Sequence, residues 1–375
     1  MIDGASVGLA AATALGVATV EILDWQVEPV AYPATTPSTL GLQRVVATVR
    51  SSDDRASGPP GDVQAVRMFV KTLGSLRHSP LFELIPIEVR EIAVASFPWR
   101  LEIDVLASNL LERLPDGLRP PRVYRIEDLG DDRARLYLED VRFVDDAWDL
   151  DRYAGAARLL GRMAGRIDAS ASEGAVGPRP DFIRLLVNQR VRLTLPMITG
   201  DEVWHHPAIA ANVDPAVRPR LLALWERTPE LLDRRDRLPR AFGHGDACPQ
   251  NLLVVADGTV VAIDWGIASD HPIGSDLAQL LIGRAEALDI GPDELRALLP
   301  GLVPAFVSGF RDEGGSIDAE DVRMAFLSTM VLRSAFTGLP VELLMGPPRP
   351  GMDLGQVLRA RSATTTYLLD LADTL

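Results

Sequence analysis

The chain is nearly without lysine: of its 38 basic residues, Lys71 is the only lysine and the other 37 are arginine. Arginine therefore serves wherever a generic positive charge is needed, and position 71 is the exception. Lysine presents a compact ammonium on a flexible stem, whereas the guanidinium is a planar fork. Retention of lysine here indicates a small cation in a narrow space, such as a phosphate-binding site. The alternative is an accident of an arginine-rich composition.

Cysteine is equally scarce, because Cys248 is the only one in 375 residues. A single cysteine excludes an intrachain disulfide, and it excludes a zinc site built from several cysteines. The absence of disulfides is compatible with a reducing compartment. We expect a cytoplasmic protein.

Positive charge is also in deficit, since 52 acidic residues give a net charge of -14. A protein that binds nucleic acid needs basic surface to displace counterions, so this balance argues against such a partner. Residues 4–20 carry no charge at all. They lack the basic start of an export signal and are short for a bilayer span. We expect an apolar helix packed on the body of the protein, and no membrane partner.

The first third of the sequence alternates between strand and turn patterns. A turn rich in Pro, Thr, Ser and Gly at residues 34–41 separates the first two expected strands, and a polar loop at 51–61 precedes the third. Apolar residues at helical spacing predict one long helix over residues 92–114. The expected strands are 25–32, 42–50, 66–71, 122–126 and 134–139.

Helical patterns dominate from residue 148 onward. The exception is an expected hairpin, in which residues 251–255 and 260–263 flank the turn at Asp257-Gly258. Together with the antiparallel sheet of the first third, this pattern predicts an α+β fold. The expected helices are 153–166, 184–195, 217–232 and several from 277 to the end.

A second decisive segment spans residues 242–251, FGHGDACPQN, and is followed at a short distance by Asp264. Within it, Asn251 lies five positions after Asp246. An Asp, a following Asn, a hairpin and a second Asp form a known arrangement for phosphoryl transfer. The first Asp orients the acceptor hydroxyl and takes its proton, whereas the Asn and the second Asp hold Mg²⁺ against nucleotide phosphates.

In these motifs the chain resembles the aminoglycoside phosphotransferase family of the protein-kinase-like superfamily. The resemblance is carried by His244-Gly245-Asp246 with Asn251, and by Ile263-Asp264-Trp265; it extends from about residue 25 to 279. It implies a bilobal fold with a nucleotide-binding sheet lobe at 1–140 and a helical acceptor lobe at 141–375. It further implies ATP and Mg²⁺ as cofactors. The implied roles are Asp246 as catalytic base, Asn251 and Asp264 as Mg²⁺ ligands, and Lys71 as the ligand of the α- and β-phosphates.

The same resemblance indicates further nucleotide-binding residues. Family members place a glutamate partner for the lysine on the following helix, which points to Glu102, with Glu91 and Glu88 as competitors. The turn between the first two strands would cover the phosphates through backbone amides and hydroxyls. Main-chain groups of an interlobe hinge near residues 138–141 would face adenine. The remaining candidate nucleotide ligands are Ser38, Thr39, Gly41, Glu139 and Val141.

Some positions depart from the family pattern. Cys248 lies where many members carry histidine, and Ala247 replaces a usual leucine. Gly245 occupies the position of the protein-kinase loop arginine and no Ala-Pro-Glu segment follows, so a protein kinase is disfavoured. We expect His244 to support the loop rather than act as a base. Asp276 matches a family aspartate that braces the loop from a helix start.

The expected activity is ATP- and Mg²⁺-dependent phosphorylation of a hydroxyl on a small molecule. Residues 181–232 and 292–344 mix carboxylates with many arginines and show no dense acidic cluster. This pattern favours a neutral or singly charged acceptor, such as a sugar, a choline-like alcohol or an amino-alcohol, over an aminoglycoside antibiotic. A nucleotide-binding pseudokinase that acts as a scaffold is the alternative from another functional class.

Overall fold

The computed structural model describes residues 2–30, 36–51, 63–80, 82–85, 87–96, 98–144, 147–177, 181–339, 343 and 352–375. Contacts divide the chain into two compact units. The sheet unit comprises Met1–Ser108, Pro120–Val144 and Val254–Gly266, and the helical unit comprises Asn109–Arg119, Asp145–Leu253 and Ile267–Leu375. Each unit is therefore assembled from separated segments. Division into functional lobes at residue 140 stays a prediction, and most of the predicted loop at 51–61 lies outside the described residues.

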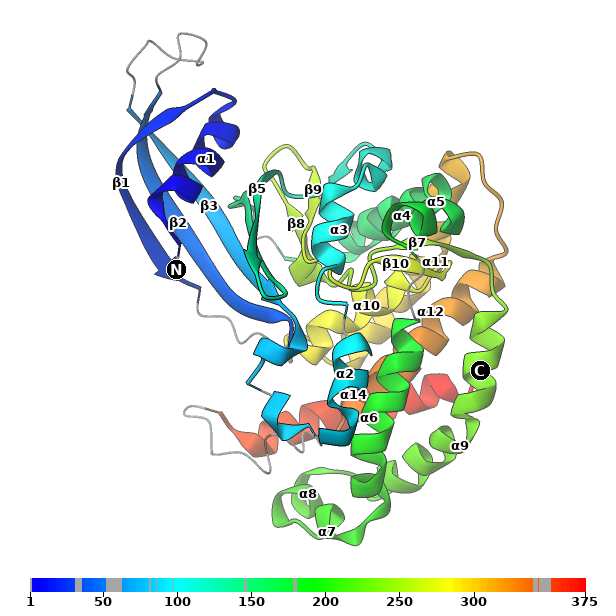
Figure 1. The fold of residues 1–375 in the computed structure, drawn as a ribbon. Helices are drawn as coiled ribbons and strands as arrows, with labels where there is room; N and C mark the ends of the chain where they lie inside the picture. The colour runs from blue at the N-terminus through cyan, green and yellow to red at the C-terminus, as the bar shows by residue number, and fades with distance from the viewer. Residues whose placement is uncertain are drawn as a thin grey trace. The chain divides into compact units, whose positions relative to one another are not determined.

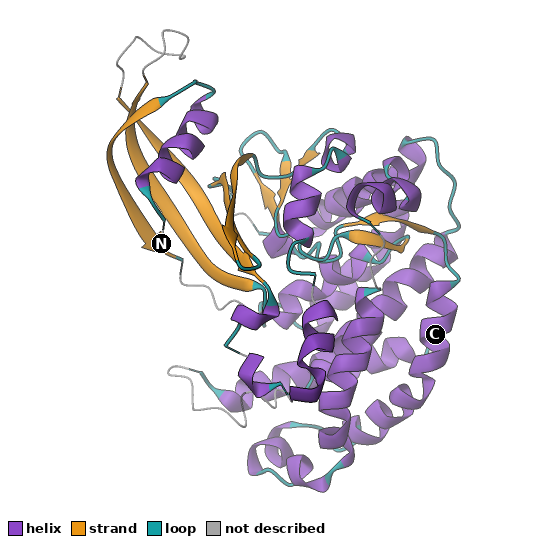
Figure 2. Ribbon diagram, viewed as in Figure 1, coloured by secondary structure: helices purple, strands orange, loops and turns teal. Residues whose placement is uncertain are grey.

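A five-stranded antiparallel sheet with strand order β1-β2-β3-β6-β5 forms the centre of the sheet unit (Figures 1 and 2). Each expected strand of the first third overlaps a strand of this sheet, although residues 31–32 of the first lie outside the described residues, and the α+β fold class is confirmed. Long β-branched and aromatic runs explain why these segments are extended. The strands are β1 (Val20–Pro29), β2 (Thr39–Ser51), β3 (Val63–Gly74), β5 (Val123–Gly130) and β6 (Arg133–Glu139).

Helix α1 (Gly4–Leu15) packs on one face of this sheet (Figure 1). Asp3 caps its start by accepting a hydrogen bond from Ser6 N, and Gly16 ends it in the left-handed conformation at φ 68°. Val7 and its neighbours bury their side chains against the sheet, so the expectation of an apolar helix packed on the body of the protein is confirmed. The apolar side chains of this contact are Val7, Ala10, Ala11, Val45, Ala47, Val49, Met68 and Val70.

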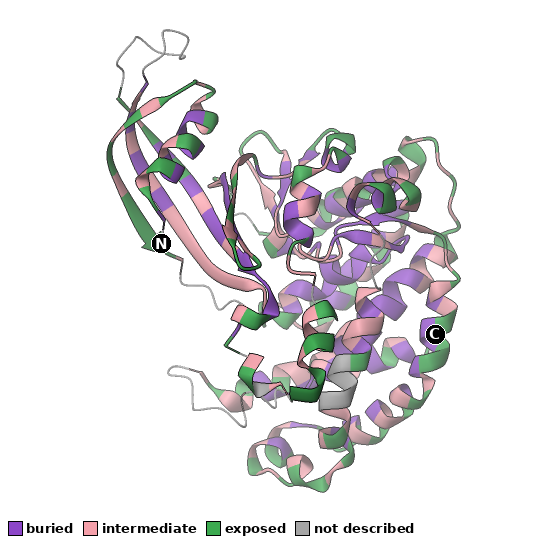
Figure 3. Cartoon of the chain, in the orientation of Figure 1, coloured by how far each residue is buried: buried purple, intermediate pink, exposed green. Residues whose placement is uncertain are grey.

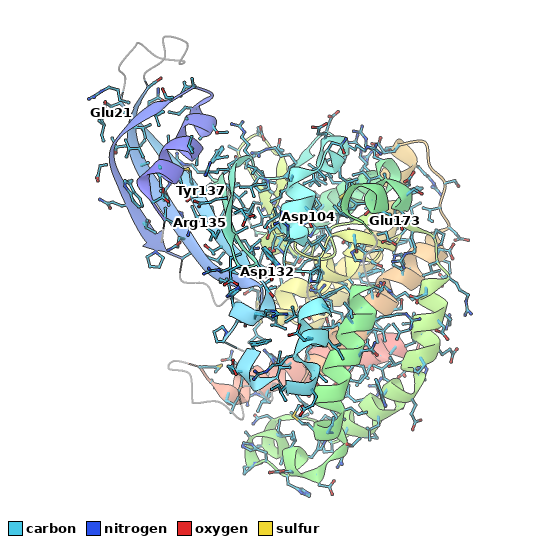
Figure 4. The ribbon with its side chains drawn as sticks, in the orientation of Figure 1. Glu21, Asp104, Asp132, Arg135, Tyr137 and Glu173 are labelled. Carbon is cyan, nitrogen blue, oxygen red and sulfur yellow. The ribbon has the colours of Figure 1, made fainter. Side chains whose placement is uncertain are left out.

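A polar cluster also joins α1 to the sheet. The Glu127 carboxylate accepts hydrogen bonds from Ser6 Oγ (2.7 Å), Arg135 Nη1 (2.8 Å) and the Tyr137 hydroxyl (3.2 Å). Arg135 and Tyr137, both labelled in Figure 4, are two positions apart on β6 and therefore share a face of the sheet. Burial raises the pKa of Tyr137, which keeps its hydroxyl a donor at neutral pH.

Strand alternation decides which face of the sheet each side chain meets. On β3, Met68 and Val70 pack toward α1, whereas Leu73 packs with Ile103 of α3 (Leu101–Ala107). Lys71 is one position from Val70 and two from Leu73, so it belongs to the α3 face. The pleat of β3 thus points the single lysine toward the helix that carries Glu102.

The predicted long helix over residues 92–114 is wrong. Pro98 interrupts it, because proline lacks the N–H of a helical hydrogen bond and disfavours helix in the residue before it. Short helical pieces replace it, and Glu102 consequently lies in the first turn of its own helix. The pieces before and within this stretch are η1 (Leu76–His78), η2 (Phe82–Leu84), η3 (Ile87–Val89), α2 (Arg90–Ser96), α3 and η4 (Leu110–Arg113).

The helical unit contains the helices predicted after residue 148 (Figure 2). Arginines of the first of these, α4, pair with the end of α11: Arg158 with Asp312 (2.8 Å), and Arg162 and Arg166 with Glu313 (2.7 Å each). Helix bounds are α4 (Leu150–Arg166), α5 (Ala169–Val176), α6 (Phe182–Thr199), α7 (Asp201–Trp204), α8 (Pro207–Asn212), α9 (Val217–Asp236), α10 (Asp276–Glu286), α11 (Pro292–Asp312), α12 (Ala319–Ser334), η6 (Ala335–Thr337) and α14 (Leu354–Ala372).

Short strands frame the two Asp-containing motifs. In the helical unit, β7 (Arg240–Gly243) pairs antiparallel with β10 (Ser269–Pro272), a strand that the sequence pattern did not predict. In the sheet unit, the predicted turn at Asp257-Gly258 is closed by a hydrogen bond from Gly258 N to Val255 O (2.9 Å). The other short strands are β4 (Leu118–Arg119), β8 (Leu252–Val254) and β9 (Val260–Ala262).

Helix α10 forms the interior of the helical unit, and most of its residues are buried (Figure 3). It starts at Asp276, directly after β10 and its turn, so the first turn of a buried helix lies beside the strand pair that leads into residues 244–251. Of the helices in the described part of the chain, none has the length and apolar character to span a membrane.

Candidate functional site

Lys71 lies between two carboxylates within the sheet unit. Its Nζ is 2.7 Å from Glu102 Oε2 and 2.9 Å from Asp264 Oδ1. Lys71 is 7% exposed and Glu102 is 4% exposed, whereas the Asp264 side chain is 42% exposed. Backbone N–H of Trp265 donates to the Glu102 carboxylate, which ties α3 to the segment after β9. One face of the cluster is therefore closed, and the Asp264 side keeps access to solvent.

The charges in this cluster stabilise one another. Burial disfavours the charged form of Lys71, but Glu102 and Asp264 more than offset it and raise the pKa of Lys71 well above its usual range. Burial raises the pKa of Glu102 and the Lys71 ammonium opposes that shift. Lys71 therefore remains a cation throughout the neutral pH range.

Asp264 has an unusual backbone, with φ at 62°. Aspartate and asparagine tolerate this left-handed region better than branched residues, because their short polar side chains bond locally. The conformation follows directly after β9 and turns the chain at the point where the carboxylate meets Lys71. Position 264 thus combines a special backbone with a charged contact, which is frequent at functional sites.

The competing glutamates do not contact Lys71 in the structure. Glu91 pairs with Arg77 (2.6 Å), and Glu88 is exposed. Among the predicted phosphate-covering residues, Ser38 O accepts a hydrogen bond from Gly74 N (2.9 Å). Thr39 and Gly41 flank an irregularity in the register between β2 and β3. Their contact with nucleotide stays a prediction.

The predicted adenine-facing segment at the end of β6 is held by ion pairs that the sequence did not indicate. The Asp140 carboxylate, 10% exposed, accepts hydrogen bonds from Arg44 Nε (2.9 and 3.0 Å) and from Arg67 Nε (3.0 Å). The Glu139 N–H donates to the Arg122 carbonyl, and the Arg122 N–H donates to the Glu139 carboxylate. These contacts hold the main chain that leads to Val141.

The segment of residues 242–251 in the helical unit starts within β7, and Asp276 braces it. The buried Asp276 carboxylate accepts from His244 N (2.9 Å) and Gly245 N (2.7 Å). Gly245 has φ at 79°, and a Cβ there would collide with Ile267 O, so only glycine fits. His244 is 1% exposed and its Nδ1 accepts from Asp246 N (3.2 Å), which agrees with a supporting role.

Asn251 orients the Asp246 carboxylate in the same unit. Its Nδ2 donates to Asp246 O (2.9 Å) and to Asp246 Oδ2 (3.1 Å). Because both partners only accept, the amide must present its NH₂ group to them. The Asn251 amide oxygen is then the atom that this residue can offer to a metal cation. One asparagine thereby orients the Asp246 carboxylate and keeps an oxygen atom available.

Cys248 is a half-buried residue of this loop. Burial, with the neighbouring Asp246 charge, raises the pKa of the Cys248 thiol to about 12. A Cβ placed on Gly283 of α10 would lie 2.5 Å from Cys248 Cβ, so glycine is needed for this close approach. A thiol with so high a pKa is a poor nucleophile at neutral pH.

The sequence patterns missed Arg333 of α12. Its Nη2 donates to Asp246 Oδ1 (2.7 Å) and its Nη1 donates to Gly245 O (2.9 Å). The side chain is 14% exposed. The sequence signal for Arg333 was weak. It is a single cation within a run of apolar residues, it is one of 37 arginines, and 87 positions separate it from Asp246.

Comparison with protein families gives one match. The model described as "Phosphotransferase enzyme family" matches residues 110–310, which is more than half of the chain. The matched span contains Asp246, Asn251 and Asp264, whereas Lys71 and Glu102 precede it. No curated protein matches the sequence significantly.

Solved structures share the fold at low sequence identity. Plasmodium vivax ethanolamine kinase has 11% identity, a TM-score of 0.52, and coverage of 92% of this chain and 83% of its own. A spectinomycin phosphotransferase in complex with ADP and spectinomycin has 12% identity, a TM-score of 0.52, and coverage of 99% and 98%. Choline kinase from Cryptosporidium parvum has 13% identity, a TM-score of 0.50, and coverage of 94% and 90%. The predicted protein-kinase-like α+β fold is confirmed.

Proposed function

The chain belongs to the phosphotransferase enzyme family, and from this premise we propose that it transfers the γ-phosphoryl group of ATP to a hydroxyl group of a small molecule in the presence of Mg²⁺. The family membership confirms the prediction of a phosphotransferase enzyme. The nucleotide, the metal and the class of acceptor are parts of the proposal, and the geometry of the two residue clusters supports them.

The observation that carries the proposal is the Lys71 cluster. A buried ammonium is held 2.7 Å from Glu102 and 2.9 Å from the more exposed Asp264. A lysine held by a glutamate on a helix is the arrangement by which kinases bind the α- and β-phosphates. Binding of the polyphosphate would add negative charge beside a cation that is already fixed, so little reorganisation is required.

Asp246 is the proposed catalytic base. Its carboxylate is oriented by Asn251 and Arg333, and its side chain keeps 28% exposure. In the proposed reaction the acceptor oxygen forms a bond to the γ-phosphorus as the bond from that phosphorus to the bridging oxygen breaks. The acceptor proton passes to the Asp246 carboxylate, and the products are ADP and a phosphomonoester.

The residues present suit a magnesium ion. Asp264 offers a solvent-accessible carboxylate, and the hydrogen bonds of Asn251 direct its amide oxygen away from Asp246. Oxygen ligands of this kind, together with phosphate oxygens and water, are the ligands that Mg²⁺ prefers. When bound, the ion would neutralise charge on the nucleotide phosphates.

Turnover of MgATP tests this proposal against the pseudokinase alternative. We expect ADP release that depends on an added hydroxyl compound and stops when EDTA removes the metal. The measurement is ADP formation across a panel that contains ethanolamine, choline, simple sugars and kanamycin. Binding of MgATP without turnover on any acceptor, water included, would support the scaffold and contradict the enzyme.

We predict that the acceptor is neutral or carries a single charge. Several carboxylates of the helical unit pair with arginine: Asp181 with Arg235 (2.8 Å), Asp236 with Arg184 (2.5 Å) and Asp370 with Arg220 (3.0 Å). In the described part of the chain there is no group of three or more acidic, histidine or cysteine side chains placed to hold a metal ion. The described residues therefore offer a polycation no compact acidic cluster of this kind.

Salt dependence separates the two acceptor classes. Exposed charge pairs are screened over about 8 Å at physiological ionic strength, so the KM of a polycation rises steeply with salt. For a neutral or singly charged acceptor we expect KM to change less than about threefold between about 0.05 and 0.5 M salt. Efficient phosphorylation of kanamycin, with a kcat/KM that falls sharply as salt rises, would restore the antibiotic-resistance function.

A further inference from the structure

Arg333 is a cation, 14% exposed, between buried residues of α12 in the helical unit. Its neighbours on α12, Val331, Leu332 and Ser334, are at most 3% exposed. Burial of a cation is costly unless hydrogen-bonding partners and an opposite charge compensate it. The partners of Arg333 are Gly245 and Asp246. The free-energy cost of burying its charge is therefore offset at the proposed active site.

The contacts of Arg333 restrict the Asp246 carboxylate from one side. Nη1 bonds the carbonyl of Gly245 (2.9 Å) and Nη2 bonds Asp246 Oδ1 (2.7 Å), while Asn251 Nδ2 bonds Asp246 Oδ2 (3.1 Å). Each carboxylate oxygen thus has its own donor, and the two donors come from different elements. Rotation of the carboxylate about its χ2 torsion would break at least one charge-assisted bond.

The guanidinium is itself held in place. With its amide oxygen turned toward Arg333, the buried Gln279 of α10 accepts from Nη2 (2.6 Å) and from Nε. The Phe182 ring of α6 lies under the guanidinium, 5.4 Å from Cζ to the ring centroid. Protein groups therefore accept the hydrogen bonds that the Arg333 guanidinium could otherwise donate to an acceptor molecule. The same groups fix the orientation of the guanidinium.

We propose that Arg333 is a positioning residue of the phosphoryl-transfer reaction, which holds the Asp246 carboxylate in the orientation that accepts the proton of the acceptor hydroxyl. This inference rests on the proposed function. Arg333 acts through Asp246 and does not touch the reacting atoms. A planar fork can bond a backbone carbonyl and a carboxylate simultaneously, whereas an ammonium can satisfy only one of these directions well.

Three variants test the inference, with MgATP hydrolysis and phosphorylation of an acceptor from the panel above as the probes. We expect Arg333→Ala to lower kcat about 100-fold, because small displacements of a catalytic group cost about that much. The Kd of MgADP should change less than about twofold, since nucleotide ligands are untouched. Arg333→Lys should lose at least about tenfold in kcat. The matched control is Arg323→Ala, on the same helix in an exposed pair with Glu320, which should behave as the unaltered enzyme.

Chemical rescue and a double variant separate positioning from a purely structural role. Methylguanidinium should raise the kcat of Arg333→Ala at least about tenfold and should leave the kcat of Asp246→Asn unchanged. In the Asp246→Asn background, Arg333→Ala should reduce the residual rate less than about threefold, because residues that act as a unit are not additive.

The contrary outcomes are equally definite. Arg333→Ala with kcat within about threefold of the unaltered enzyme and a lowered melting temperature would make Arg333 a structural residue only. If the losses of kcat from the two single substitutions multiply in the double variant, Arg333 acts independently of Asp246. If Arg333→Ala does not fold, full activity of Arg333→Lys overturns the inference. An unaltered enzyme without turnover overturns the proposed function and the inference together, whereas active variants overturn the inference alone.

Discussion

Replacement of Lys71 by arginine is expected to reduce kcat by about 100-fold or more, although the charge is kept. The Nζ lies 2.7 and 2.9 Å from two carboxylates in a site where the lysine side chain is 9% exposed. A guanidinium is larger, and overpacking a closed site displaces the surrounding groups. It also presents separated N–H donors in place of one point charge, so the phosphate contact would move.

The measurement is steady-state turnover of MgATP by Lys71→Arg beside a reciprocal control on the neighbouring strand β2. Arg50→Lys changes a 43%-exposed side chain that pairs with Glu21, and its kcat should stay within about twofold. Comparable activity of Lys71→Arg and the unaltered enzyme would mean that the single lysine is an accident of composition.

Asp246→Asn and Asp264→Asn are expected to fail in different ways. Asp246→Asn should lower kcat by about 10²- to 10⁴-fold, the range contributed by a general base, with little change in MgATP affinity. Asp264→Asn should weaken MgATP binding, because it removes the anion that faces both Lys71 and the proposed metal. Asparagine is chosen at both positions since it preserves shape, and at position 264 it also tolerates the left-handed backbone.

Calorimetric titration with MgATP, paired with single-turnover rates, distinguishes the two carboxylates. Titration with ATP in EDTA serves as the metal-free control, in which the affinity difference between Asp264→Asn and the unaltered enzyme should shrink. Should Asp246→Asn lose nucleotide binding while Asp264→Asn retains it, the two roles would have to be exchanged.

Residues close in sequence to a motif could be predicted well. The spacing of five positions predicts that Asp246 and Asn251 share one loop, and in the structure the Asn251 amide bonds the Asp246 carboxylate. Alternation on β3 likewise points Lys71 to the face where Glu102 of α3 lies. These inferences needed only the strand period and short connections.

Contacts between distant segments could not be predicted in this way. Arg333 is one arginine among 37, and nothing in its neighbours shows that α12 would bring it to Asp246. The pairing of Asp140 with Arg44 and Arg67 depends in the same manner on strand register. Charged side chains are chemically alike along this sequence, and tertiary packing alone decides which of them meet.

Helix boundaries were a separate source of error. Apolar spacing over residues 92–114 suits a helix throughout, but Pro98 removes a hydrogen-bond donor within it. The break allows α3 to start at Leu101 with its own direction, and Glu102 enters the Lys71 cluster from its first turn. The local rule for proline was the correct guide there, against the wider periodicity.

Because Lys71 is the only lysine, it is the one side-chain amine that amine-reactive reagents can modify. Acylating reagents attack neutral amines, and Glu102 and Asp264 raise the pKa of Lys71 and keep it charged. Reagents that diffuse from bulk solvent would therefore modify it slowly. A nucleotide that carries an acyl phosphate would instead deliver its electrophile by binding. One adduct on the intact chain would then report one occupied nucleotide site, with no other side-chain amine to confuse the mass.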